Sequence, residues 1–228
     1  MKISFKNGNI YPVITIFLIY ILSIIGFPRL FISIFNITNK NLIYYILVVF
    51  GFFGIFLMSF YLRKRKINSI EFEKKKSFGY SFLIAIAGFF LVFNLQVFLT
   101  LILRVLGFDV ISLNTDALTK IIKEHKIFLL YAVIIAPVLE ELFFRKTVFG
   151  YLYDIFNTKN EIVKFIIPSF ITGVIFALPH DGISPLIIIY IIISMVFSFA
   201  YFHTKRIITP IIMHILMNSL VMIAQFLT

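Results

Sequence analysis

The sequence of 228 residues contains no cysteine, and only 14% of its residues are charged. The absence of cysteine excludes disulfide bonds and metal sites built from thiolates. The low charge excludes an ordinary soluble domain, in which about 25% of the residues are charged. Two signatures of hydrolases are also missing, because no serine or cysteine stands at a nucleophile elbow and no His-Glu-x-x-His motif occurs.

What the sequence has instead is apolar, since hydrophobic residues make up 61% of it and gather in long runs. No Asp, Glu, Lys, Arg or His occurs within 7–28, 41–62 or 77–103. Each of these runs reaches the roughly 20 residues that an α-helix needs to cross a bilayer. The first run is longer than the apolar core of a cleavable signal peptide, and no clear small-x-small site follows it. We therefore expect it to be a permanent span.

The pattern predicts an all-α fold, a polytopic membrane bundle of about seven transmembrane helices. The predicted spans are 9–28, 41–62, 78–103, 127–149, 163–180, 183–202 and 208–227. The longest connection, 104–126, mixes apolar and charged residues, and we expect it to form an amphipathic helix on the surface.

The formal net charge is +11. In a membrane protein such an excess orients the helices and contacts anionic lipid headgroups, so we expect a membrane-lipid partner and no nucleic acid. With the N-terminus inside, the inner segments contain 14 lysines and arginines and the outer segments contain 6. The positive-inside rule then predicts a cytoplasmic N-terminus. The oligomeric state stays open.

The fourth predicted span contains two acids and a base, Glu140, Glu141 and Arg145. A charged side chain in hydrocarbon costs about 3 kcal/mol on insertion scales, so we interpret the group as functional. Glu141 and Arg145 are four residues apart and are predicted to form an ion pair. Glu140 is rotated by about 100° and needs another partner or an aqueous cavity, for which Pro137 could make room by kinking the helix. The alternative is that these charges only hold helices together.

Two later spans contain histidines. His180 follows Phe176 by four residues, and Asn218 follows His214 by four, so each pair shares one helix face. With Glu140 they provide a base, a second acid–base group and hydrogen-bond donors, which are the parts that activate water and stabilise a tetrahedral oxyanion. For His180 alone, an interfacial position at a helix end is a strong alternative.

Other readings of the polar residues stay open. Glu140, His180 and His214 would also make a plausible zinc set with one open position, although their spacing does not require a metal. We expect Gln96 and Ser194 to hydrogen-bond between helices. Simple spans place Glu140 roughly 20 Å from the outer end of its helix and His180 roughly 22 Å from the inner end of the next. The two would meet only if the fifth span were shifted or broken at Pro179.

Three motifs occur in order on successive late spans: Glu-Glu-x-x-x-Arg, Phe-x-x-x-His and His-x-x-x-Asn. This order resembles the CPBP family of intramembrane proteases, also called the Abi or type II CAAX prenyl protease family. The resemblance covers 127–228, which would be the four-helix catalytic core, whereas 1–126 would be a variable N-terminal part. It implies a helical bundle whose cavity opens to one side of the membrane.

The resemblance also implies residue roles. Glu140 would activate water with help from His180, Glu141 would pair with Arg145, and His214 and Asn218 would stabilise the oxyanion. Phe176 of the second motif would contact substrate. Whether such enzymes require a divalent metal such as zinc stays open.

The leading hypothesis is an intramembrane endopeptidase in a prokaryotic plasma membrane. It would hydrolyse a membrane-associated or lipidated protein or peptide precursor. One alternative is a non-enzymatic membrane partner, such as a bacteriocin-immunity or scaffold protein. Another is a proton-coupled transporter, since intramembrane Glu and His also mark proton relays, although the sequence shows no repeat symmetry.

Overall fold

The computed structural model describes residues 9–227 except 64, 66 and 157, and every regular element in that part is a helix. Six helical segments are long and apolar enough to cross a membrane. They are Tyr11–Ile34 (α1 Tyr11–Ile21, η2 Leu22–Gly26 and α2 Phe27–Ile34), α3 Lys40–Arg63, α4 Phe78–Val105, α9 Glu161–Asp181, α10 Ile187–Thr204 and α11 Ile208–Leu227. The predicted all-α membrane bundle is confirmed.

The fourth predicted span forms one helical stretch, Phe128–Ile155, which we call the central helix. It continues past the predicted end at residue 149. Its consecutive pieces are α6 Phe128–Leu130, η4 Tyr131–Ile135, α7 Ala136–Glu141, η5 Leu142–Phe149 and α8 Gly150–Ile155, of which η4 and η5 are π-helical. π-helical turns are rare and occur most often at functional sites.

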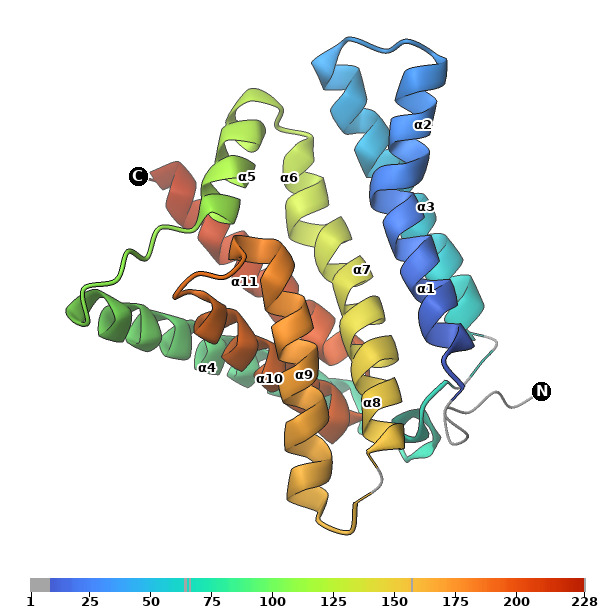
Figure 1. Cartoon of the computed structure of the whole chain (residues 1–228), viewed down its shortest axis with the longest axis vertical. Coiled ribbons are helices and arrows are strands. Elements are labelled where there is room, and N and C mark those ends of the chain that lie inside the picture. The colour runs from blue at the N-terminus through green and yellow to red at the C-terminus, as the bar shows by residue number, and fades with distance from the viewer. Residues whose placement is uncertain (1–8, 64, 66, 157, 228) are drawn as a thin grey trace.

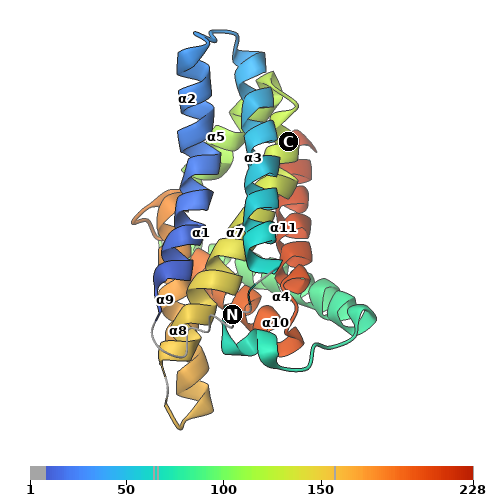
Figure 2. The ribbon, with the colours of Figure 1, turned by 90° about the vertical axis from the view of Figure 1, so that its right-hand side faces the viewer.

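The central helix separates two apolar cores (Figures 1 and 2). On one side α1 and α3 pack against it, with Ile16, Met58 and Leu139 fully buried between them. On the other side α4, α10 and α11 form a second core around Val92 and Met213. Helix α4 is steeply inclined to α1–α3 (Figure 1), so the bundle is splayed rather than parallel.

Two glycines of α3 allow its close approach to its neighbours, Gly51 to the central helix and Gly54 to η2 of the first span. A Cβ atom at Gly51 would lie 2.5 Å from Ile135 Cγ2, and one at Gly54 would lie 2.6 Å from Ser23 Cβ. Small residues allow membrane helices to pack at short distance, which replaces the missing hydrophobic drive between helices in lipid. The glycines therefore fix the central helix against the N-terminal helices.

Helix α9 runs without a break through Pro179 and ends where Gly182 adopts a positive φ of 62°. The Gly182 N–H donates to Leu178 O at 3.2 Å, a common way for glycine to close a helix. In Figure 1, α9 begins beyond the end of α8 and finishes level with α7. This stagger brings the last turn of α9 beside the middle of the central helix.

The predicted helix in 104–126 is present as α5, Leu113–Glu124. It begins at Ser112, whose Oγ accepts from the Thr115 N–H at 3.1 Å and so caps the first turn. Thr119 and Ile122 are buried, whereas most of the remaining helix is exposed. The helix is therefore amphipathic, as expected.

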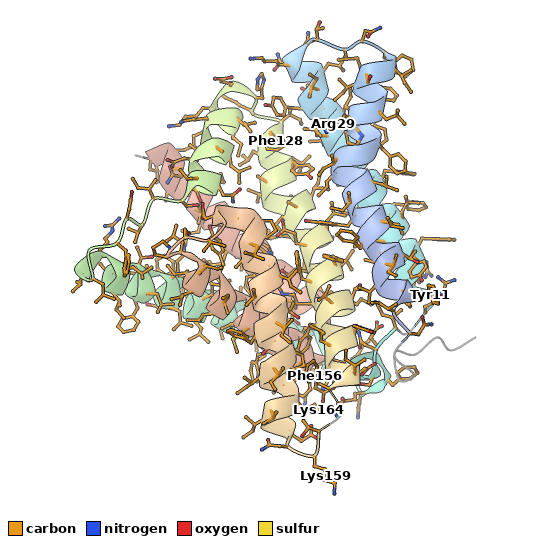
Figure 3. The ribbon with its side chains drawn as sticks, in the orientation of Figure 1. Tyr11, Arg29, Phe128, Phe156, Lys159 and Lys164 are labelled. Atoms are coloured by element: carbon orange, nitrogen blue, oxygen red, sulfur yellow. The ribbon has the colours of Figure 1, made fainter. Side chains whose placement is uncertain are left out.

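The connection between α3 and α4 contains the short helix η3, Ser69–Phe72, and is fastened to the far end of the central helix. Lys146 Nζ lies 2.8 Å from Glu71 Oε1, and Asn68 Nδ2 donates to Lys146 O at 2.7 Å. Figure 3 shows Lys159 and Lys164 at this same lower end of the molecule and Arg29 at the opposite end.

Candidate active site

A sealed charge cluster lies in the middle of the central helix. Arg145 Nη1 is 3.1 Å from Glu141 Oε1, and neither side chain has any exposed surface. His214 Nδ1, from α11, lies 2.9 Å from the same carboxylate oxygen. Arg145 Nη2 donates to Ser194 Oγ at 3.1 Å, so the expected interhelical bond of Ser194 has a guanidinium as its partner. The pair expected from the i, i+4 spacing thus also ties three helices together.

Aromatic rings cover the guanidinium of Arg145. Its Cζ atom lies 4.4 Å from the ring centroid of Phe176 and 5.2 Å from that of Phe197. A cation over an aromatic face is attracted by the ring quadrupole, more strongly when it is removed from water. The expected substrate residue Phe176 is itself only 2% exposed, and its ring lies against Arg145.

Glu140 has a different environment from Glu141. Its side chain is 17% exposed, and its Oε2 lies 3.8 Å from His214 Nε2, beyond direct hydrogen-bonding distance. It borders a cavity of about 420 Å³ instead of the sealed cluster. The division between the two glutamates that the sequence suggested is therefore present in the geometry.

His180 is held by the backbone of its own helix. Its Nδ1 lies 2.8 Å from Phe176 O, and since a carbonyl only accepts, Nδ1 has the proton and Nε2 has a lone pair. The ring is packed between Phe176 and Tyr190, at 4.5 and 4.8 Å between centroids. These contacts fix both the tautomer and the orientation of the imidazole.

One cavity brings the predicted residues together. Glu140 of the central helix, His180 of α9, and His214 and Asn218 of α11 all line it. Of the two ways in which Glu140 and His180 could meet, the structure has the shifted span, because the stagger of α9 places its end beside the central helix without a break at Pro179. Other lining residues are Gln96, Thr100, Ser112, Asn114, Tyr131, Phe176, Leu186, Ile189, Tyr190, Ile193, Phe197, Met217 and Met222.

Asn218 compensates for a defect in the central helix. The Ala136 N–H donates to Tyr131 O, five residues back. In that register the next carbonyl, Ala132 O, would be bonded by residue 137, which is proline and has no N–H. Asn218 Nδ2 donates to Ala132 O at 2.9 Å. One amide hydrogen of Asn218 therefore has a structural partner, and its second hydrogen remains for a ligand.

The sequence did not indicate Asp181, which follows His180 and fastens the wall of the cavity. Its Oδ2 accepts from Ser112 Oγ and from Tyr190 Oη, each at 2.8 Å, and its Oδ1 accepts from the Asn114 N–H at 3.0 Å. The carboxylate thus joins α9, α10 and the start of α5. A carboxylate at the end of an apolar helix was a signal that could have found it.

The possible zinc set does not fit this arrangement. Across the described residues, no three His, Cys, Asp or Glu side chains are grouped so that they could hold a metal ion. Glu140, His180 and His214 line the same cavity without forming such a group.

The chain is similar to known membrane proteases. The family model of type II CAAX prenyl endopeptidase Rce1-like proteins matches residues 123–220. The chain is 36% identical over 190 residues to the membrane-embedded CAAX protease MroQ of Staphylococcus aureus, covering 83% of this chain and 76% of that protein. It is 34% identical over 165 residues to the putative membrane peptidase YdiL of Bacillus subtilis, covering 72% and 64%.

A shorter match is the UPF0177 protein YaiH of Lactococcus lactis, 35% identical over 88 residues, covering 38% of this chain and 33% of that protein. No solved structure matches the chain. The range matched by the family model includes every predicted site residue from Glu140 to Asn218.

Proposed function

The chain belongs to the CPBP family of membrane proteases, and from this premise we propose that it is an intramembrane endopeptidase. It hydrolyses a peptide bond of a membrane-associated or lipidated protein or peptide precursor. The observation that supports this most strongly is the meeting of Glu140, His180, His214 and Asn218 at one cavity. The N-terminal helices, 1–126, would support a catalytic core formed by 127–228.

The first step is the attack of water on the scissile carbonyl. The Glu140 carboxylate takes one proton from the water as the new bond forms between water oxygen and carbonyl carbon. His180 Nε2, with its lone pair, accepts the second hydrogen of that water and orients it. This role follows from the Nδ1–H···O=C bond to Phe176, which leaves Nε2 as the acceptor.

The oxyanion that forms needs donors. In the imidazolium form of His214 both ring nitrogens donate, Nδ1 to the Glu141 carboxylate at 2.9 Å and Nε2 to the oxyanion. The second amide hydrogen of Asn218 is the other donor.

In the last step the carbon–nitrogen bond breaks and Glu140 returns its proton to the leaving amine. Both products then have complete valence, and the enzyme is restored without a covalent intermediate. Glu141 and Arg145 touch no reacting atom in this scheme. They position His214 and Ser194 from inside the sealed cluster.

The experiment uses the purified full chain in proteoliposomes with a panel of farnesylated and unmodified membrane-bound peptides. Mass spectrometry maps new termini in ¹⁸O-labelled water, so that hydrolysis is seen as label in the new carboxylate. We expect Glu140→Gln and His180→Gln to lower the cleavage rate by about 10²–10⁴-fold, the range for general acid–base groups. The thermal midpoint should stay unchanged for Glu140→Gln.

Glu124→Gln is the matched control, because Glu124 is 71% exposed on α5 and lies outside the cavity lining. Cleavage by Glu140→Gln at the wild-type rate would show that the mechanism is wrong. Preserved biological activity in a catalytically dead Glu140→Gln strain would favour the non-enzymatic partner instead.

A further inference from the structure

The cavity has a definite direction along the helices. Its floor lies near the middle of the bundle, at Glu140, His214 and Phe197. Its walls extend from there toward one end only, through the last turn of α9, the second half of α11 and the start of α5. No residue of the described basic connections at the other end borders it.

The closed end of the cavity is the basic end of the molecule. The described parts of the connections 63–77 and 205–207 lie there and are rich in lysine and arginine, and the connection 156–160 adds Lys159. Figure 3 shows Lys159 and Lys164 at this end, and Figure 1 shows α5 and the C-terminus toward the other. With 14 lysines and arginines against 6, the positive-inside rule puts the basic end in the cytoplasm.

A second cavity adjoins the first on the side of the lipid. It has a volume of about 270 Å³ between α4 and α11 and shares Gln96, Thr100, Met217 and Val221 with the first. Its outer border includes Leu101, which is 54% exposed. The site therefore borders a second cavity that reaches the membrane-facing surface in the half of the bundle away from the basic end.

We propose that the protease works on the extracytoplasmic side of the membrane and that its substrates are exported peptide segments. This inference rests on the proposed endopeptidase function and narrows its substrate class. A lipidated protein on the cytoplasmic leaflet would face the closed end. A translocation step must therefore supply the substrate before it is cleaved.

The side of the membrane that the cavity faces is measured by labelling single introduced cysteines, which needs no substrate. The chain has no native cysteine that would be labelled as well. The variants Thr115→Cys at the cavity wall, Thr38→Cys in the α2–α3 connection and Lys159→Cys at the basic end each offer one thiol. A membrane-impermeant maleimide is added to intact cells and to permeabilised cells. We expect Thr115→Cys and Thr38→Cys to be labelled in both, and Lys159→Cys only after permeabilisation.

The reverse pattern overturns the proposal. Repeating the labelling with Glu140→Gln in the background separates it from the catalytic assignment, since labelling needs no cleavage. For the substrate, one apolar reporter peptide is fused either to an export signal or to a cytoplasmic lipid anchor. Cleavage of the exported form alone supports the proposal, and cleavage of only the cytoplasmic form contradicts it, whichever residue proves to be the base.

Discussion

The two faces of the central helix hold their glutamates in different environments, one sealed from water and the other bordering a cavity. Glu141 is fully buried and contacts Arg145 and His214, whereas Glu140 borders the cavity. A rotation of about 100° separates them. On one face every charge is matched inside a sealed cluster, and on the other a carboxylate is left available to water. Packing alone thus gives adjacent identical residues different environments, which fit the structural role proposed for Glu141 and the catalytic role proposed for Glu140.

Removing Arg145 is expected to have the largest effect on the sealed cluster. Arg145→Met leaves the Glu141 carboxylate buried beside His214 alone, and breaking a buried ion pair in this way costs about 3–5 kcal/mol. We expect a large fall in the unfolding midpoint in detergent. The double variant Glu141→Gln/Arg145→Met should regain much of the loss, because neither charge is then left unpaired.

The control for this prediction is Lys205→Met. Lys205 Nζ lies 2.9 Å from Glu73 Oε2, but Glu73 is 52% exposed, so the pair should contribute no more than about 1 kcal/mol. A double variant as unstable as Arg145→Met would show that the cluster is not held by the charge pair. This measurement of stability does not depend on the cleavage rate of Glu140→Gln, so it tests the buried face independently of the cavity face.

Asn218 bonds the backbone of the central helix and also lines the cavity, so its structural and catalytic roles can be separated. Asn218→Ala leaves Ala132 O without its donor, at a cost of about 1–3 kcal/mol for an unsatisfied buried group. Adding Pro137→Ala supplies a backbone N–H in the same register. We expect the double variant to recover its unfolding midpoint, while cleavage per folded molecule stays about 10²-fold low, as for loss of an oxyanion donor.

Two outcomes would contradict this division of roles. If Pro137→Ala/Asn218→Ala recovers both stability and cleavage, Asn218 is only a structural residue. If neither recovers, the missing proline N–H is not the reason for the Asn218 contact. Pro137→Ala alone is the control, and it should leave the midpoint unchanged or raise it, because a helix-interior proline is itself unfavourable.

The sequence predicted what depends on one helix at a time. Apolar runs predicted the spans, and the i, i+4 spacing predicted the pairing of Glu141 with Arg145. Contacts between distant segments were not predicted: Asn218 and Ala132 are 86 residues apart, and Asp181 and Ser112 are 69 apart. Such contacts depend on the tilt and stagger of helices, which close packing sets rather than periodicity.

The depth of His180 in the bundle is another feature that depends on helix stagger and could not be predicted from the sequence. Span ends read from hydropathy place each helix independently in the bilayer, so they gave no reason to set α9 lower than the central helix. The stagger in Figure 1 arises from packing of α9 on α10 and η5. The π-helical turns were not predicted either, and of these η4 ends two residues before Pro137.

The smallest expected effect concerns Asp181, on the cavity side. Asp181→Asn removes one of the oxygens that accept from Ser112, Tyr190 and the Asn114 N–H, and a net bond contributes about 0.5–1.5 kcal/mol. We expect cleavage to fall by about threefold to tenfold. Ser112→Ala should mainly raise KM by loosening the α5 wall, and Tyr190→Ala should mainly lower kcat by removing the ring that packs on His180. Equal effects of both variants on KM and kcat would show that Asp181 stabilises the fold without positioning the site.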